Sequence, residues 1–221
     1  MRAISLIPGR GGSKRFPRKN VAPLLGKPLL AWTIEPALEA AIFDEVLVSS
    51  DDEGILAAGD RFGAARHERG EELSGDRVPV LDVCLAVLDE HPADALYVML
   101  PTSPLRTPET IRRAWKTFEG SGAEALLSVV PLEYPPQWAL TVRDAVVTPL
   151  YPETYTTPRQ ELAPGLRHDG GHAIFDAASL RERRTFLAGR TVPFEAPPEE
   201  AVDVDEPGDL DRAERLLESR K

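Results

Sequence analysis

Residues 6–20 read Leu-Ile-Pro-Gly-Arg-Gly-Gly-Ser-Lys-Arg-Phe-Pro-Arg-Lys-Asn. The apolar residues 3–7 predict a buried first strand, which runs directly into this glycine-rich loop. Glycine lets the backbone turn tightly and point successive N–H groups at one anion. The loop also holds five cations: Arg10, Lys14, Arg15, Arg18 and Lys19. So many like charges would repel one another without an anionic partner, and a nucleoside triphosphate suits such a loop.

Two common phosphate-binding loops do not match this stretch. The P-loop needs a glycine directly before its lysine, and Ser13 stands there. The dinucleotide fingerprint can begin at Gly9 and Gly11, but its third glycine falls on Lys14. Lysine is a poor substitute for a glycine that allows close packing of helix on strand. The alternative to a binding loop is an ordinary glycine-rich turn with solvated charges.

Length and composition narrow the class of protein. A chain of 221 residues with 42% hydrophobic residues has enough core for one large domain, which we predict over residues 1–221. Its 26 Lys and Arg against 36 Asp and Glu give a net charge of −10. This charge argues against a general nucleic-acid or anionic-membrane surface. The basic cluster is therefore a local feature, as expected of a binding site.

No feature of the sequence predicts export or insertion into a membrane. No apolar run approaches the length of a membrane helix, and the first residues lack the apolar segment of a signal peptide. A single cysteine excludes an internal disulfide and fits a reducing compartment, so we expect a cytoplasmic protein. Cys84 lies on the apolar stripe of a predicted helix and is interpreted as a core residue.

Predicted strands and helices alternate along the chain. The strands are 3–7, 45–50, 95–100, 125–130, 173–176 and 192–195. Three helices are predicted at 29–41, 78–89 and 108–119. A further helix runs to Arg61 and is capped by Ser50 or Asp51, another follows residue 176, and a last one ends at about Ser219. This order predicts an α/β fold with a parallel sheet and helices on both faces. Ligands of such sheets bind beyond the carboxyl ends of the strands, where the basic loop, residues 50–51 and residues 102–106 are expected to converge.

The alternation stops between Pro131 and Leu166. This stretch contains seven prolines and four tyrosine or tryptophan residues. A structureless loop of that length is uncommon inside a compact domain. We therefore predict that residues 131–166 form an extended arm or small subdomain, inserted in the domain and packed on a partner chain. A flexible linker is the alternative, although linkers seldom hold so many aromatic residues.

Two aspartates form a second candidate site. Asp203 and Asp205 are two residues apart, so on an extended segment both side chains point to the same side. Paired carboxylates repel unless a cation lies between them, and Mg²⁺ binds through one or two carboxylates plus substrate phosphates. The alternative is that these residues cap the helix that begins near Pro207. Beside a predicted triphosphate loop, a Mg²⁺ site is the preferred interpretation.

These segments together resemble a known family. Residues 7–20 resemble the opening signature of the acylneuraminate cytidylyltransferases, also called CMP-sialic acid synthetases. Further matching segments follow in the family's order: 48–52, 69–76, 101–106, 158–160, 167–170 and 203–205. The resemblance implies a Rossmann-like nucleotidyltransferase domain with a dimerisation arm, in a homodimer whose arm reaches into the neighbouring active site. It also implies that CTP reacts with a 2-keto-3-deoxy sugar acid to give the CMP-sugar and pyrophosphate.

The resemblance implies residue roles by position. The expected phosphate-binding residues are Arg10, Gly11, Lys14 and Lys19, and two of these, Arg10 and Lys19, are the expected catalytic residues. The other expected nucleotide-pocket residues are Asn20, Arg69 and Asp76. The expected residues on the acceptor side are Leu100, Thr102, Ser103, Arg159 and Gln160. Of these, Arg159 matches an arm arginine that meets the sugar carboxylate in the partner's site. The expected Mg²⁺ ligands are Asp203 and Asp205.

Three positions depart from the family pattern. Gly9 replaces an alanine, Leu100 replaces a glutamine before Pro-Thr-Ser-Pro, and Trp138 replaces a lysine found in some members. The last two changes fall on the acceptor side. Glutamine both donates and accepts hydrogen bonds, and leucine does neither. We therefore expect an acceptor that is less polar at these contacts than N-acetylneuraminic acid, such as legionaminic acid, pseudaminic acid or a smaller acid.

Three other functions stay open at this point. The first is the same chemistry on a Kdo-like sugar or a phosphonate. The second is a nucleoside-triphosphate hydrolase or kinase, which the unmatched P-loop disfavours. The third is a non-catalytic nucleotide-binding regulatory protein, which Lys19, Asp203 and Asp205 disfavour.

Overall fold

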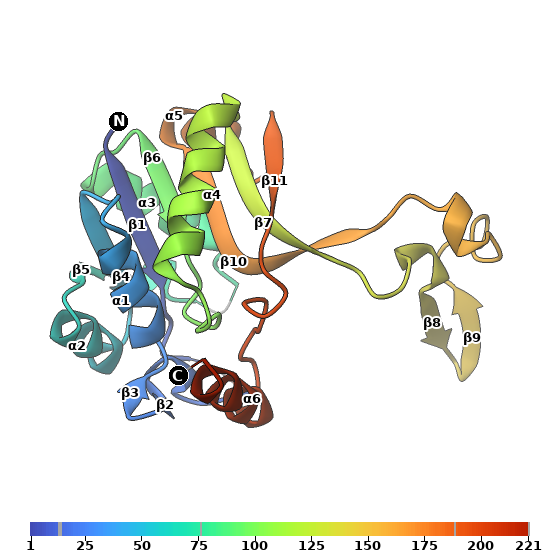
Figure 1. The fold of residues 1–221 in the computed structure, drawn as a ribbon, viewed down its shortest axis with the longest axis horizontal. Coiled ribbons are helices and arrows are strands. Elements are labelled where there is room, and N and C mark those ends of the chain that lie inside the picture. The colour runs from blue at the N-terminus through green and yellow to red at the C-terminus, as the bar shows by residue number, and fades with distance from the viewer. Residues whose placement is uncertain (13–14, 76, 188, 221) are drawn as a thin grey trace.

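A seven-stranded sheet forms the centre of the molecule (Figure 1). The computed structural model describes residues 1–12, 15–75, 77–187 and 189–220. Across the sheet the strands are β11 (Thr191–Glu195), β7 (Ala125–Pro131), β10 (Leu166–Asp176), β6 (Ala95–Val98), β1 (Ala3–Pro8), β4 (Glu45–Ser50) and β5 (Ala65–Glu68). Residues 3–7 of β1 are all buried, as the apolar sequence predicts. The basic loop therefore starts at the centre of the sheet.

The sheet is mostly parallel, with one strand reversed. β1 is parallel to β4 and β6, β4 is parallel to β5, and β7 is parallel to β11. β10 is antiparallel to both β6 and β7, so the sheet is mostly parallel, as predicted, with this one strand reversed. β10 also begins at Leu166, earlier than predicted, and is irregular between His168 and Ala173. The reversal follows from the connection, because the arm leaves β7 and returns beside it.

Helices cover both faces of the sheet, as predicted. α1 (Ala31–Ala40), α2 (Glu53–Arg61) and α4 (Pro108–Ser121) bury apolar residues on one face. α3 (Val80–Glu90) and α5 (Ala177–Arg183) do so on the other, where Cys84 is buried in the core. α6 (Pro207–Glu218) packs Ala213 and Leu217 onto a smaller cluster beside the short ribbon β2 (Pro23–Leu24) and β3 (Lys27–Pro28).

The start of α2 corrects a second prediction. Neither Ser50 nor Asp51 caps this helix. Asp52 is the N-cap, and its carboxylate accepts from the Ile55 N–H at 3.0 Å. Ser50 lies one step earlier, where its hydroxyl accepts from the Asp52 N–H. Two consecutive aspartates follow β4, and the sequence around them does not indicate which one caps the helix.

The segment between β7 and β10 leaves the sheet as an arm, at the right of Figure 1. It contains an antiparallel hairpin, formed by β8 (Leu140–Arg143) and β9 (Val146–Pro149), so it is not structureless. The Trp138 indole donates to the Thr157 carbonyl at 3.2 Å and ties the two halves of the arm together. Val142 and Val146 of the hairpin are 67% and 59% exposed in the single chain. Packing of the arm on a partner chain stays a prediction.

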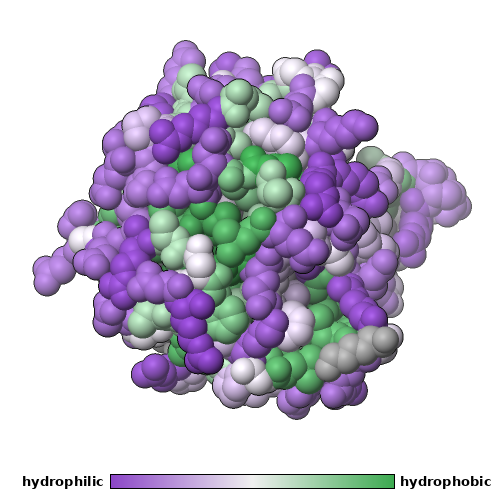
Figure 2. Space-filling view, turned by 60° about the vertical axis from the view of Figure 1, so that its left-hand side comes forward, coloured by the Kyte–Doolittle hydropathy of each residue, from purple (hydrophilic) through white to green (hydrophobic). Residues whose placement is uncertain are grey.

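Hydrophilic residues cover most of the face drawn in Figure 2, and apolar residues show between them. Among the residues that the structure describes, no helix is both long enough and apolar enough to cross a membrane.

Candidate active site

The basic loop is fixed to the end of the neighbouring strand. The Gly9 N–H donates to the Ser49 carbonyl at 2.9 Å, and the Gly11 N–H donates to Oδ1 of Asp51 at 3.0 Å. A Cβ at Gly11 would lie 2.9 Å from Cβ of Asp52, so a side chain would displace the loop from α2. The carboxyl ends of β1 and β4 therefore hold the loop at the edge of the sheet where ligands of this fold bind. Lys14 lies outside the described residues.

The end of the loop meets one of the predicted metal ligands. Nζ of Lys19 lies 2.8 Å from Oδ1 of Asp205, although the two residues are 186 positions apart. The Arg15 guanidinium lies 3.0 Å from the other oxygen of the same carboxylate. Asn20 is buried, and its amide donates to the Arg10 carbonyl at 3.0 Å, so it shapes the loop from behind. The structure thus brings the predicted triphosphate and metal residues into one site.

Asp203 and Asp205 lie on one side of an extended segment. Val202 and Val204 alternate with them and are buried, and the Val204 N–H donates to the Thr102 carbonyl at 2.8 Å. The helix-cap alternative is wrong for both aspartates. Glu206 is the N-cap of α6, and Asp209 accepts from the N–H groups of Asp205 and Glu206.

The donor set of this segment fits Mg²⁺. The hydrogen bond from Lys19 is the main cause that lowers the pKa of Asp205, so this carboxylate is ionised. It has two oxygens with several lone pairs, so it can keep Lys19 and still accept a cation, while Asp203 is exposed. Among the described residues no group of three or more His, Cys, Asp and Glu side chains is placed to hold a metal ion. Substrate phosphates would therefore have to complete the coordination, as is usual for Mg²⁺.

Arg69 lines a cavity of about 180 Å³ beside the loop. The cavity is enclosed by residues of four segments: Pro8, Arg10, Arg69, Leu73, Ser74, Gly75, Val78, Val80, Val83 and Leu100. Nε and Nη2 of Arg69 donate to the hydroxyl and the carbonyl of Ser49 at 2.9 and 2.8 Å. Burial is the main cause that lowers the pKa of this guanidinium. Arg10 and Arg69 therefore share one cavity, as predicted for a nucleotide pocket, and Asp76 lies outside the described residues.

Leu100 follows β6 and separates this cavity from a second one. The second cavity, of about 330 Å³, is almost wholly apolar: Val80, Val98, Leu100, Leu127, His168, Gly170, Ala173, Phe175, Phe186 and Leu187 line it. Gly170 has φ +77°, and a Cβ there would lie 2.9 Å from the Leu100 side chain. The motif search on the sequence missed Leu127, Phe175 and Phe186, because they lie on separate elements and belong to no local motif.

Thr102 and Ser103 have structural contacts and line neither cavity. The Thr102 carbonyl accepts from the Val204 N–H and so holds residues 203–205, and Ser103 is 3% exposed. The Arg106 guanidinium is also buried and donates to the Leu100 carbonyl at 3.1 Å. These residues therefore set the position of Leu100 and Asp203 from behind.

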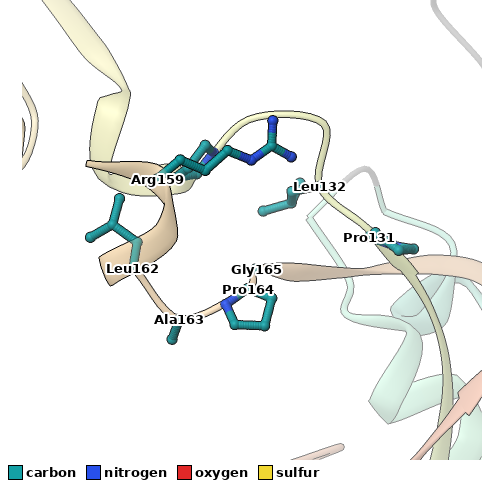
Figure 3. Close-up of a pocket in the computed structure, with 8 residues that line it drawn as sticks. Pro131, Leu132, Arg159, Leu162, Ala163, Pro164 and Gly165 are labelled. Carbon is teal, nitrogen blue, oxygen red and sulfur yellow. The ribbon is translucent and has the colours of Figure 1, made fainter. Parts of the chain in front are cut away.

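Arg159 and Gln160 are not brought to the basic loop within one chain. Both belong to a short 3-10 helix of the arm, Arg159–Glu161, which lies well away from the sheet (Figure 1). Arg159 lines a separate cavity of about 180 Å³ near the base of the arm, with Pro131, Leu132 and Leu162 around it (Figure 3). A role at the active site would require a second copy of the chain.

The chain is similar to known nucleotidyltransferases along its length. The family model "Cytidylyltransferase" matches residues 4–158. The chain is 32% identical over 224 residues to the pseudaminic acid cytidylyltransferase of Campylobacter jejuni. The alignment covers 98% of this chain and 96% of the relative. It is also 32% identical over 231 residues to the CMP-N,N'-diacetyllegionaminic acid synthase of Legionella pneumophila. That alignment covers 99% of this chain and 97% of the relative. The N-acylneuraminate cytidylyltransferase A of Danio rerio is 30% identical over 204 residues, covering 91% of this chain and 47% of the relative.

Solved structures agree on the fold. The CMP:2-keto-3-deoxy-manno-octonic acid synthetase complexed with CTP superposes with a TM-score of 0.75 at 20% identity, over 100% of both chains. The 4-diphosphocytidyl-2C-methyl-D-erythritol synthase superposes with a TM-score of 0.70 at 16% identity, over 98% of this chain and 99% of the other. At these identities the likeness supports the nucleotidyltransferase fold alone. The family model and the full-length relatives go further: the chain belongs to the cytidylyltransferase family and is a CTP-dependent nucleotidyltransferase.

Proposed function

We propose that the protein transfers CMP from CTP to a nonulosonic acid, a 2-keto-3-deoxy sugar acid of the sialic, legionaminic and pseudaminic group, and releases pyrophosphate. The observation that carries this proposal is the contact between Lys19 and Asp205, which joins the cation-rich loop to the paired carboxylates. Such an arrangement suits a metal-bound triphosphate. The names of the full-length relatives supply the nonulosonic acid as acceptor.

In this proposal the protein positions reactants and balances charge. The anomeric hydroxyl of the sugar attacks the α-phosphorus, and negative charge builds on the leaving pyrophosphate. Arg10 and Lys19 would bind that charge, and Asp203 and Asp205 would hold Mg²⁺, which neutralises phosphate oxygens when bound. Arg69 and the cavity beside it would hold the nucleoside. Catalysis by placement and charge requires no protein nucleophile.

A screen of pyrophosphate release tests the function directly. Four nucleoside triphosphates are each combined with N-acetylneuraminic, legionaminic, pseudaminic and Kdo acids in the presence of Mg²⁺. We expect release with CTP and a nonulosonic acid together, and none with CTP alone. Release without an acceptor would identify a hydrolase, binding without release would identify a regulatory protein, and a preference for Kdo would move the acceptor to another sugar class.

The acceptor is expected to present an apolar group to Leu100. The adjoining apolar cavity supports this expectation, since Leu100 lines both cavities and would lie between nucleotide and sugar. A hydroxyl of N-acetylneuraminic acid left unpaired against leucine would cost about 1–3 kcal/mol. A deoxygenated nonulosonic acid, with methyl groups in place of some hydroxyls, avoids that cost. We therefore propose legionaminic or pseudaminic acid as the preferred acceptor.

Leu100→Gln tests this preference. We expect the variant to raise kcat/KM for N-acetylneuraminic acid relative to that for pseudaminic and legionaminic acids by about tenfold, because the amide supplies the missing partner. Leu100→Met, which keeps the position apolar, is the matched control and should leave the ratio unchanged. If wild type already prefers N-acetylneuraminic acid and Leu100→Gln adds nothing, ordinary sialic acid is the acceptor and bridging water meets its hydroxyls.

We also propose a homodimer with exchanged arms, acting in the cytoplasm. The exposed valines of the β8–β9 hairpin and the distance of Arg159 from the basic loop support the dimer, because a second copy could use both. The reduced, buried thiol of Cys84 is in keeping with a cytoplasmic protein.

A further inference from the structure

His67, Ser49 and Arg69 form a buried series of hydrogen bonds behind the nucleotide cavity. β4 and β5 pair so that Ser49 lies opposite His67. Oγ of Ser49 lies 2.8 Å from Nδ1 of His67, and Nε of Arg69 donates to the same Oγ at 2.9 Å. Ser49 is 0% exposed and His67 is 2% exposed, so water does not compete for these bonds. Arg69 reaches the cavity, and His67 does not.

The donor and acceptor roles in these hydrogen bonds determine which ring nitrogen of His67 carries the proton. A guanidinium only donates, so the Ser49 hydroxyl accepts from Arg69. The hydroxyl could also accept from a protonated Nδ1, but its own proton has no other acceptor among the described residues, so it is directed to Nδ1 of His67, which is then unprotonated. Neutral His67 therefore holds its proton on Nε2, which lies 3.7 Å from Oε1 of Glu90. That distance is too long for a hydrogen bond, so the buried Nε2 has no hydrogen-bond partner among the described residues, although the Glu90 carboxylate lies nearby.

We propose that neutral His67 is a positioning residue for the nucleotide, because it orients the Ser49 hydroxyl that holds Arg69 in the cavity. The inference rests on the proposed function, in which that cavity takes the nucleoside of CTP. The bonds to Ser49 use Nε and Nη2 of Arg69 and leave Nη1, which bonds to no described residue. The Ser49 carbonyl also accepts from the Gly9 N–H, so the same serine fixes the start of the basic loop.

The surroundings of His67 favour its neutral form. Burial lowers the pKa of His67 most, the nearby His91 and Arg69 lower it further, and Glu90 opposes them. His91 is itself engaged, with Nδ1 3.0 Å from a carboxylate oxygen of Glu45. Protonated His67 would donate from Nδ1 to the Ser49 hydroxyl and displace the hydroxyl proton. A buried polar proton would then lack its acceptor, and the bond that orients Ser49 would be lost.

Calorimetric titration with CTP and Mg²⁺, without an acceptor, tests the inference. His67→Leu removes the acceptor atom, and we expect CTP to bind about tenfold more weakly. His67→Asn is the matched control, because its carboxamide oxygen stands near the position of Nδ1, and its affinity should stay within about threefold of wild type. Both variants alter a buried site and should lower Tm, so only CTP binding separates them.

A double mutant tests whether His67 acts on CTP binding through Ser49. Ser49→Ala should weaken CTP binding as His67→Leu does, and the variant with both changes should bind no more weakly than Ser49→Ala alone, because both act through one bond. Equal affinity of His67→Leu and wild type would overturn the inference, and so would an equal loss in His67→Leu and His67→Asn. Failure of the wild type to bind CTP would instead overturn the proposed function.

The pH dependence of CTP binding is a second test, because an acceptor histidine and a cationic histidine predict changes of opposite sign. The ratio of wild-type to His67→Asn affinity should fall as the pH is lowered from about 8 to about 5, because protonation removes the acceptor that asparagine keeps. CTP's own ionisation affects both proteins and cancels in the ratio. A histidine that acted simply as a cation would raise the ratio in acid, because positive charge near an anionic ligand strengthens binding. A ratio that rises as the pH is lowered would contradict the inference.

Discussion

Asp203→Asn should lower turnover about 100-fold at limiting Mg²⁺, with little change in Tm. The substitution removes one charge from the proposed metal site and keeps the shape of the side chain, and charge stabilisation of this kind is worth about 10²–10³ in rate. The fold should persist because Asp203 is exposed and caps no helix, and the buried Val202 and Val204 hold the segment. Initial rates against Mg²⁺ concentration, together with thermal melts, provide the measurement.

Asp211→Asn is the matched control for this experiment. Asp211 is an exposed aspartate of α6, close in sequence but outside the site, so its substitution changes the net charge equally. We expect its Mg²⁺ dependence to equal that of wild type. Near-normal turnover of Asp203→Asn at limiting Mg²⁺ would remove Asp203 from the metal site.

Arg159→Ala should raise the KM for the acceptor acid about 100-fold and leave the KM for CTP nearly unchanged. Arginine binds a carboxylate through two parallel, charge-assisted hydrogen bonds, and alanine supplies none. Arg159 lies in the arm, away from the cavity that holds Arg10 and Arg69, so the nucleotide side should be untouched. Arg143→Ala, an exposed arginine of the same arm, is the control and should behave as wild type.

Mixing subunits tests whether the arm acts on its partner. If Arg159 serves the neighbouring site, a dimer of one Arg159→Ala and one Lys19→Ala subunit has one site with both residues intact. Random exchange of equal amounts makes half of the dimers mixed, so activity should recover to roughly a quarter of wild type. Light scattering that shows only monomer, or absence of recovery in subunits proven to exchange, would mean that Arg159 does not act across a dimer.

The sequence predicts the elements of this fold better than their relative directions. β4 matches its predicted bounds, because a short apolar run ends in Ser-Ser-Asp-Asp. β5 has no predicted counterpart, since Arg66 and His67 interrupt its apolar pattern and its stability comes from pairing with β4. The reversed β10 is likewise invisible locally, because alternation of buried residues is the same in a parallel and an antiparallel strand.

Some parts of the candidate site can likewise be predicted from the sequence, and others cannot. Motifs and the family resemblance point to the basic loop, Arg69 and the two aspartates, because the proposed roles need fixed residue types at fixed places. The apolar cavity is not predicted, since Leu127, Phe175 and Phe186 come from separate elements and look like ordinary core residues in sequence. The Ser49–His67 bond depends on strand register, which the sequence does not specify. The proposed action of Arg159 on a partner would need a second copy of the chain.

The contact between Lys19 and Asp205 has a consequence for synthesis of the chain. It joins Lys19 to a residue that leaves the ribosome 186 positions later. A nascent chain that stops before Val202 already contains every strand of the large sheet, yet lacks the carboxylate that meets Lys19 and the helix that covers Leu24 and Leu29. Prematurely terminated products would thus fold around the sheet with an unbalanced cationic loop. The pairing therefore delays assembly of the proposed active site until Asp205 has left the ribosome.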